Sequence, residues 1–165
     1  IMSNFKKKFR MEQKQKINYG IFVGNESDIE AIAQFQVDMA LESEGTKLNH
    51  ELVLKGVTAA VADPFKGTYI VARDGEKTIG SLMLTKEWSD WNNQWYWWIQ
   101  SVYVVPEYRG MGAYRAMYAK IKEMAREEGI PQVRLYVDRT NFPAQKVYQK
   151  LGMAECHYLM YEEVL

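Results

Sequence analysis

The chain has 165 residues, of which 47% are hydrophobic and 25% are charged. This length fits one domain of ordinary size, and the composition excludes a disordered or collagen-like chain. No stretch approaches the roughly 20 apolar residues of a membrane-spanning helix, and the first residues lack the features of a signal peptide. We therefore expect a single folded domain over residues 17–165 that is cytoplasmic and has no membrane partner.

The net charge of zero conceals a basic N-terminal segment. Residues 1–16 contain six Lys or Arg and one Glu, so the 15 basic and 20 acidic residues that follow make the rest of the chain mildly acidic. A basic arm can bind a phosphate backbone, but this one has no groove-reading motif. We interpret residues 1–16 as a leader that is disordered or was added to the natural chain, and we do not expect nucleic acid as a partner.

The first half of the chain predicts a strand, two helices and a hairpin. Residues Ile17–Val23 alternate and end at Gly-Asn, which is typical of a strand. The segment Ser27–Gly45 opens with the Ser-x-x-Glu pattern of a capping box, and Asn49–Ala62 predicts a second helix that is capped by Asn and stopped by Asp-Pro. Tyr69–Ala72 and Thr78–Thr85 are strand-like and are joined by an Asp-Gly turn. The residues that recur at helical spacing in the first helix are Ile29, Ile32, Ala33, Gln36, Met39 and Ala40.

The second half predicts two crossovers between strands and helices. Gln94–Val105 is too aromatic and β-branched for a surface helix, so it predicts a central strand. Ala113–Gly129 has the spacing of a long amphipathic helix. Val133–Val137 predicts a short strand, Pro143–Lys150 a short helix and His157–Glu163 a final strand. The order β-α-α-β-β-β-α-β-α-β predicts an α/β fold, with a mixed sheet and helices on both of its faces.

A glycine-containing turn, Tyr108–Tyr114, lies between the central strand and the long helix. At the start of a helix several N–H groups lack intrahelical partners and the helix dipole is positive, so an anion fits there. Glycines let the backbone approach a pyrophosphate closely, and Arg109 adds a positive charge. A plain tight turn is the alternative. A dinucleotide-binding fingerprint is disfavoured, because the Gly-x-Gly-x-x-Gly spacing is missing.

Two segments in register resemble motifs of the Gcn5-related N-acetyltransferase (GNAT) superfamily. Residues Val102–Tyr114 are similar to its Arg/Gln-x-x-Gly-x-Gly/Ala motif, which follows a strand. Residues Asn141–Met153 are similar to its Asn-x-x-Ala-x-x-x-Tyr-x-x-Leu-Gly-Phe pattern. One departure is Tyr114, which stands where the family usually has Gly or Ala. The resemblance implies the GNAT-like fold, a central and mostly antiparallel sheet flanked by helices.

The resemblance also implies acetyl-CoA as cosubstrate and transfer of its acetyl group to an amine. The backbone that precedes the glycine turn would pair with pantetheine, with the N–H of Val104 facing the thioester oxygen, and Tyr148 would be the general acid. As structural alternatives, Tyr148 is a core aromatic residue and Asn141 is a helix cap. No metal is expected. The coenzyme-binding residues implied are Val102, Tyr103, Val104, Arg109, Gly110, Met111, Gly112, Ala113, Tyr114, Asn141, Ala144 and Tyr148.

Three carboxylates are candidates for the general base. A free alkylamine has a pKa of about 10, so its deprotonation at neutral pH costs roughly 4 kcal/mol and requires a base or a water chain. Glu42 and Glu44 lie between the first two helices, and Asp90 lies in the polar loop Glu87–Asn93. Each of the three is equally compatible with a solvated surface carboxylate.

The acceptor pocket is predicted from the aromatic residues around the central strand. Trp88 and Trp91 share the polar loop with Asp90, and rings beside a carboxylate suit a cation. Gln100, on the strand itself, could orient a water or the acceptor. We therefore expect the primary amine of a small molecule or peptide as acceptor. Most of the strand's other rings are expected to pack in the core, and exposed aromatic strands would permit a homodimer.

Two other functions are compatible with the sequence. An acyl-CoA-binding module that senses or docks without turnover would show the same coenzyme motifs. A protein-interaction or nucleic-acid-binding domain would use the basic arm, and its binding would depend on salt concentration.

Overall fold

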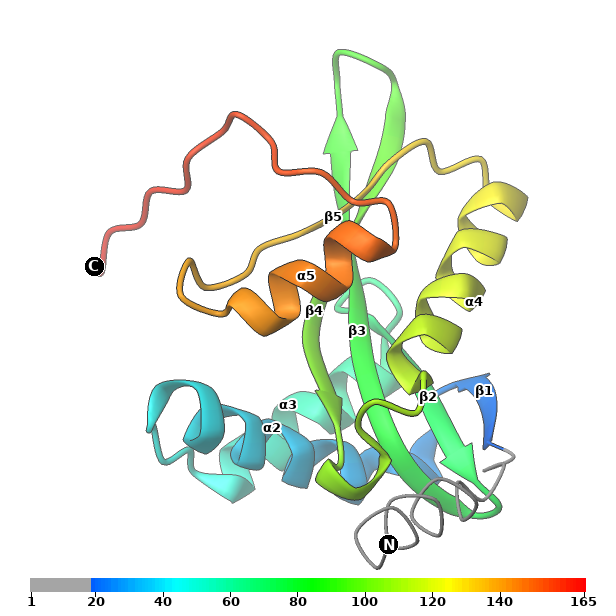
Figure 1. Ribbon diagram of the computed structural model, residues 1–165, viewed down its shortest axis with the longest axis vertical. Coiled ribbons are helices and arrows are strands. Elements are labelled where there is room, and N and C mark those ends of the chain that lie inside the picture. The colour runs from blue at the N-terminus through cyan, green and yellow to red at the C-terminus, as the bar shows by residue number, and fades with distance from the viewer. Residues whose placement is uncertain (1–18) are drawn as a thin grey trace, which may run out of the picture. The chain divides into compact units, whose positions relative to one another are not determined.

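The computed structural model describes residues 19–165, so the basic leader and the first two residues of the predicted first strand lie outside the described residues. The described residues divide into two compact units, one that ends at Leu135 and one that comprises Tyr136–Leu165. The first unit contains the sheet and three long helices, and the second contains one short helix (Figure 1). None of these described helices is both long enough and apolar enough to span a membrane.

A five-stranded sheet with the strand order β1-β2-β3-β4-β5 forms the centre of the first unit. Its strands are β1 (Tyr19–Val23), β2 (Thr68–Asp74), β3 (Lys77–Ser89), β4 (Gln94–Val104) and β5 (Val133–Leu135). The first three pairings are antiparallel, and β4 pairs with β5 in parallel. The predicted mixed and mostly antiparallel sheet is therefore confirmed.

Helices α2 (Ile29–Glu44) and α3 (His50–Ala62) pack on each other and cover one face of the sheet. As predicted, α3 is capped by Asn49, whose side chain accepts a hydrogen bond of 3.0 Å from the N–H of Leu52. The apolar core between the two helices and the sheet consists of Ile32, Ala33, Val57, Ala60, Tyr69 and Val71.

Helix α4 (Ala113–Glu127) contacts β1, β2 and β3 on the other face. Because side chains alternate along a strand, Ile70 and Ala72 of β2 point away from α2 and α3. Both residues are fully buried, as are Met117 and Ile121 of α4. Helices therefore cover both faces of the sheet, as the order of elements predicts.

Asp28, in the short 3-10 helix η1 (Glu26–Asp28) before α2, is a fully buried carboxylate. It accepts hydrogen bonds from Arg73 Nε (2.9 Å), Thr78 Oγ1 (2.7 Å) and the N–H of Asn25 (2.9 Å). Burial alone would raise the pKa of Asp28, but the hydrogen bonds together outweigh burial and hold the pKa below its usual range. The capping box is formed by Asn25 and Asp28, two residues earlier than the predicted Ser-x-x-Glu pattern. The hydrogen bonds that Asp28 accepts from Arg73 and Thr78 tie the start of α2 to β2 and β3.

The second unit contains helix α5 (Phe142–Lys150), as predicted. The prediction of a final strand over His157–Glu163 is wrong, since these residues form no strand. The backbone of a strand needs a neighbouring strand for its hydrogen bonds, and within residues 19–165 none pairs with this segment. A short run of strand-forming side chains such as Tyr158–Tyr161 is therefore not sufficient to form a strand here. The segment leaves large side chains exposed, namely Tyr158, Leu159, Met160 and Tyr161.

We expect Asp28→Asn to lower the free energy of unfolding by about 3–5 kcal/mol, because the mutation leaves Arg73 without its counter-charge. The pKa of Asp28 is lowered in the folded state, so its contribution is present above the pKa of an unfolded Asp and is lost as the pH falls toward the folded pKa. The difference between wild type and variant should thus shrink at acid pH. Urea denaturation at neutral pH and near pH 3 measures both effects.

The control for this experiment is Glu30→Gln, which removes one exposed charge from the first turn of α2. Its effect should stay within about 1 kcal/mol. Equal stability of Asp28→Asn and wild type at neutral pH would contradict the anchoring role of the buried carboxylate.

Candidate active site

The loop Arg109–Gly112, which we call the glycine loop, connects the end of β4, through the short 3-10 helix η2 (Pro106–Tyr108), to α4. Gly110 has φ 75° and Gly112 has φ 92°, both in the left-handed region that favours glycine. A Cβ on Gly112 would also lie 3.3 Å from the hydroxyl of Tyr19, which donates a hydrogen bond to the carbonyl of Met111. Glycine is therefore favoured at position 112 by its conformation, and a larger residue would also have to displace the Tyr19 hydroxyl slightly.

The glycine loop presents unpaired N–H groups at the start of α4. Within the described part of the chain, the N–H groups of Gly110, Gly112 and Ala113 donate to no acceptor. They lie at the positive end of the dipole of a 15-residue helix. This combination suits a phosphate or diphosphate group.

The side chain of Arg109 is held by β4 and α2. Its Nε donates to the carbonyl of Val104 (2.8 Å), its Nη2 pairs with Glu42 Oε2 (2.8 Å), and its guanidinium lies 5.2 Å from the centre of the Tyr103 ring. Glu42 Oε1 accepts a further hydrogen bond of 3.0 Å from the Tyr103 hydroxyl. These contacts bring together three predicted coenzyme residues and one predicted base, and they fix the glycine loop to the end of α2.

The Tyr103 phenol stays protonated over the physiological pH range. Burial, together with the hydrogen bond to Glu42, raises the pKa of Tyr103 to about 12. The hydroxyl therefore remains a donor to Glu42, whose two carboxylate oxygens are both engaged.

Strand β4 contains a bulge just before the predicted pantetheine-binding residues. Ser101 has φ 53°, which is uncommon for a residue other than glycine. The register changes there from Ser81 opposite Tyr103 to Met83 opposite Gln100, so β4 has one extra residue.

Beyond this bulge, one edge of β4 is open. The strand pairs with β5 only over Trp97–Ile99, so residues 100–104 have no neighbour on that side within residues 19–135. The N–H of Val105 donates to the carbonyl of Ile79 on β3 (3.0 Å). Because successive N–H groups of a strand point to opposite sides, the N–H of Val104 points to the open edge. That is the orientation that the predicted thioester contact requires.

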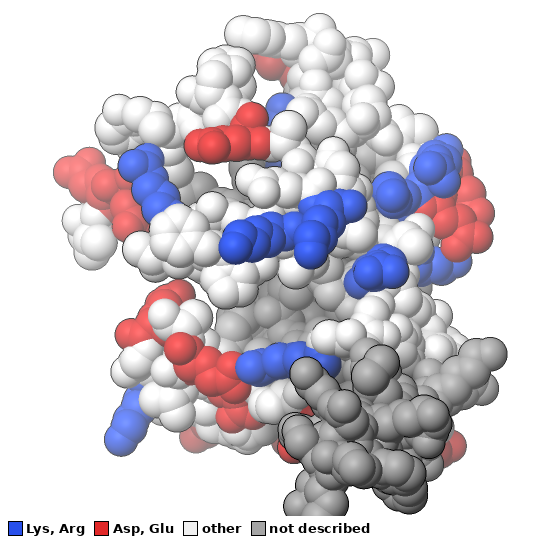
Figure 2. Space-filling model, viewed as in Figure 1, with Lys and Arg blue, Asp and Glu red and all other residues white. Residues whose placement is uncertain are grey.

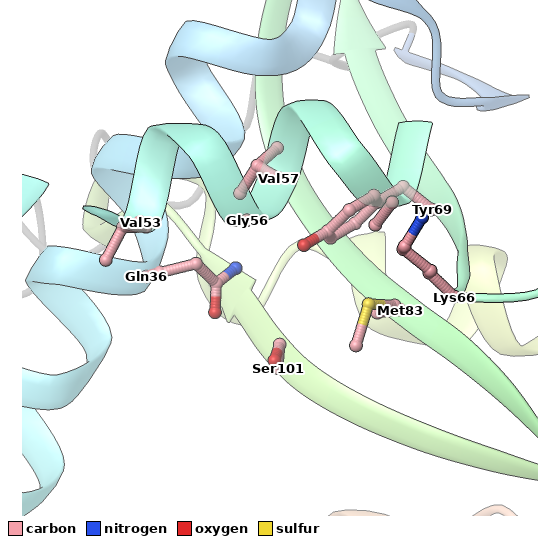
Figure 3. A pocket seen from close by; sticks show the side chains of 9 residues that line it. Gln36, Val53, Gly56, Val57, Lys66, Tyr69, Met83 and Ser101 are labelled. Atoms are coloured by element: carbon pink, nitrogen blue, oxygen red, sulfur yellow. The ribbon is translucent and has the colours of Figure 1, made fainter. Parts of the chain in front are cut away.

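A cavity of about 320 Å³ that is widely open to solvent lies on the face of the sheet covered by α2 and α3 (Figure 3). Gln36 of α2, Tyr69 of β2, Met83 of β3 and Ser101 of the bulge line it, together with residues of α3. Figure 3 shows the amide of Gln36 and the hydroxyl of Tyr69 pointing into this space. The bulge therefore lies between the open edge of β4 and a cavity large enough for a small ligand.

The predicted acceptor residues do not line this cavity. The prediction that Trp88 lies in a polar loop is wrong, since Trp88 is part of β3 and stacks edge-on against Trp95, opposite it on β4, at 5.0 Å. Such aromatic pairs stabilise a hairpin, and here the pair allows the hairpin of β3 and β4 to continue beyond the predicted end of β3. Asp90 and Trp91 are in the turn of this hairpin, and Trp91 is 89% exposed. Gln100 donates a hydrogen bond to Thr85 Oγ1 (2.6 Å).

The remaining predicted site residues lie on α2, α4 and α5. Glu44 is exposed at the end of α2, and Tyr114 lies in the first turn of α4. In the second unit, Asn141 caps α5 by accepting a hydrogen bond of 3.1 Å from the N–H of Ala144. Tyr148 lies on α5, and burial raises its pKa.

Sequence reasoning missed the polar residues of the cavity. Gln36 occupies one of the helical-spacing positions of α2, where its neighbours Ile32 and Ala33 are core residues. A polar side chain at a core position was the available signal for Gln36. Ser101 and Tyr69 carry no comparable local signal, because they reach the cavity only through the sheet register.

The charged side chains of the described residues bear on whether the protein binds nucleic acid or a metal ion. Figure 2 shows both acidic and basic side chains of the described residues on the face seen there. Among residues 19–165, no three His, Cys, Asp or Glu side chains are grouped so that they could hold a metal ion.

Residues 29–153 match the model of the acetyltransferase (GNAT) family, and the chain belongs to this family. The solved structure of a possible acetyltransferase from Clostridium difficile 630 has 39% sequence identity and a TM-score of 0.83, and the comparison covers 89% of this chain and 97% of that one. A predicted acetyltransferase from Clostridium acetobutylicum, solved with acetyl-CoA, shares the fold at 17% identity and a TM-score of 0.71, over 88% of this chain and 96% of that one.

The thialysine N-epsilon-acetyltransferase of Bos taurus is 39% identical to this chain over 54 residues. These residues are 33% of this chain and 32% of that protein, so the match spans about a third of the relative's length.

We expect Glu42→Ala to loosen the glycine loop, because Arg109 then loses its ion pair. An exposed ion pair contributes up to about 1 kcal/mol, so tryptic cleavage after Arg109 should become about two- to fivefold faster. Limited proteolysis followed by mass spectrometry measures this rate. Glu44→Ala, on the same helix end, is the matched control and should leave the rate unchanged. An unchanged rate in Glu42→Ala would show that the ion pair does not hold the loop.

Proposed function

We propose that the protein is an acetyl-CoA-dependent N-acetyltransferase that acetylates a primary amine of a small molecule or peptide. The observation that carries this proposal is the set of unpaired N–H groups of the glycine loop, next to the open edge of β4. The family and the fold shared with a structure solved with acetyl-CoA support it. The short match to a thialysine N-epsilon-acetyltransferase supports a small amine as acceptor.

The coenzyme would be held almost entirely by backbone groups. The N–H groups of the glycine loop and of Ala113 fit its diphosphate, and the backbone of Val102–Val104 fits pantetheine along the open edge. The N–H of Val104 would then stabilise the oxyanion that develops on the thioester oxygen. From their match to the family motif, we propose that Asn141, Ala144 and Tyr148 of the second unit also contact the coenzyme. Arg109 serves this site by fixing the loop through Glu42 and Val104.

In the reaction, the lone pair of the neutral amine attacks the thioester carbonyl carbon, a C–N bond forms and the C–S bond breaks. The nitrogen loses one proton to a base, the departing thiolate gains one from the Tyr148 hydroxyl, and the tyrosinate regains its proton from solvent. Because burial raises the pKa of Tyr148, its phenol is protonated and able to donate at neutral pH. Glu42 is held by Arg109 and Tyr103, and Asp90 lies in the exposed hairpin turn, so Glu44 or a chain of waters is left to take the proton from the nitrogen.

We expect wild-type protein to release thiol from acetyl-CoA when an acceptor amine is present, and Tyr148→Phe to lower kcat by about 10²–10⁴ with little change in coenzyme affinity. A thiol-release assay and calorimetry with acetyl-CoA measure the two quantities. Tyr161→Phe is the control, because Tyr161 belongs to the same unit and is 87% exposed. Because the Tyr148 hydroxyl stays protonated, its deprotonation should not lower kcat at any pH below about 10.

Unchanged turnover in Tyr148→Phe would remove this residue from the proton-donor role. Tight binding of acetyl-CoA without thiol release for any amine would favour the alternative of a non-catalytic acyl-CoA-binding module. If acetyl-CoA gave neither heat nor a shift in melting temperature, the proposed function would be wrong.

A further inference from the structure

The cavity beside the β4 bulge contains a buried donor without a protein partner. Gln36 is only 8% exposed, and its Nε2 makes no hydrogen bond with any described residue. A buried donor of this kind destabilises the free protein unless something satisfies it. Figure 3 shows the amide pointing into the cavity, and because Nε2 itself is covered, a ligand there can supply the missing acceptor only once the Gln36 side chain rotates.

The residues that line the cavity differ between its two ends. Ser101, on the bulge of β4, lies at one end of the lining, and Lys66 lies at the other end, beyond Tyr69 (Figure 3). Aliphatic side chains such as Val57 and Met83 line the space between them. Since the thioester is proposed to lie along β4, the reacting amine belongs at the Ser101 end and the rest of the acceptor extends toward Lys66.

The charges of the lining distinguish between classes of amine. None of the residues that line the cavity is acidic, and the one charged residue is Lys66. A second ammonium group in the acceptor would meet no carboxylate among the residues that line the cavity, and Lys66 would repel it. Lys66 pairs with Asp63 at 2.9 Å, but its side chain is 58% exposed, so N–H donors remain for another anion. Burial also raises the pKa of Tyr69, which keeps its hydroxyl as a donor.

We propose that this cavity binds the acceptor as a primary amine on an aliphatic chain that ends in a carboxylate, with the amine at Ser101 and the carboxylate at Lys66. This inference rests on the proposed function and names its class of substrate. It replaces the expectation of a cationic acceptor held by Trp88, Trp91 and Asp90.

Three acceptors of equal chain length test this inference in the thiol-release assay with acetyl-CoA: 5-aminopentanoate, pentylamine and 1,5-diaminopentane. For wild type we expect kcat/KM to be highest for the amino acid and roughly tenfold or more lower for the diamine, with pentylamine between them. A diamine as good as the amino acid would overturn the proposal.

Substitution of Lys66 tests the carboxylate contact. Lys66→Met should lower the preference for 5-aminopentanoate over pentylamine about tenfold, without changing the KM for acetyl-CoA. The matched control is Lys55→Met, which removes an exposed lysine of α3 that pairs with Glu51 at 2.8 Å and does not line the cavity. An equal effect of Lys66→Met on all three acceptors would contradict the contact.

Substitution of Gln36 separates binding from stability. Gln36→Met replaces the unpartnered amide by an apolar group of similar shape, so the melting temperature should stay the same or rise. The KM for the amine should rise several-fold, while the KM for acetyl-CoA stays constant. A lower melting temperature with unchanged amine kinetics would show that Gln36 is only structural.

These outcomes are distinct from a failure of the proposed function. Thiol release that favours the diamine would contradict the acceptor class and leave the acetyltransferase proposal standing. The absence of both thiol release and a melting shift with acetyl-CoA would contradict the acetyltransferase proposal and the acceptor class together.

Discussion

The bulge in β4 at Ser101 is the constraint on which the geometry of the site depends. It inserts one residue into the strand, after the last residue that pairs with β5. One consequence is that the N–H of Val104 points to an open edge, where a ligand backbone can replace the missing strand. The other is that Ser101 borders the cavity under α2 and α3. A single irregularity therefore gives β4 an edge for the proposed coenzyme and an end wall for the proposed acceptor pocket.

Two polar groups near α2 are buried with different consequences for stability. Asp28 is fully buried, and hydrogen bonds from several partners compensate its charge, so it anchors the helix. Gln36, about two turns into α2, has a buried donor without a partner in the described residues. The first arrangement stabilises the fold. The second leaves a binding group in place at a cost in stability, as is common where a protein recognises a ligand.

The parts of the fold that depend on local signals could be predicted from the sequence. The cap at Asn49, the spacing of α4 and the glycines before it act within a few residues, and the structure agrees with each. The strand predicted over His157–Glu163 failed because a strand also needs a partner elsewhere in the chain.

The same distinction applies to the candidate site. The glycine loop could be identified from its motif, because its N–H groups and its glycines are adjacent in the sequence. The pairing of Glu42 with Arg109 could not, since these residues are 67 positions apart. Nor could the cavity, whose lining comes from two helices, three strands and the connection before β2. Trp88 was misplaced because its pairing with Trp95 extends the hairpin beyond the predicted strand end.

The central claim is that the N–H groups of the glycine loop bind the diphosphate of coenzyme A. It is tested most directly by recording ¹H–¹⁵N spectra of the labelled protein during a titration with coenzyme A. We predict that the amide signals of Gly110, Gly112 and Ala113 are among the most strongly shifted and that they saturate together. If these signals stayed in place while amides elsewhere shifted, the diphosphate would be bound at another site and the central claim would be contradicted.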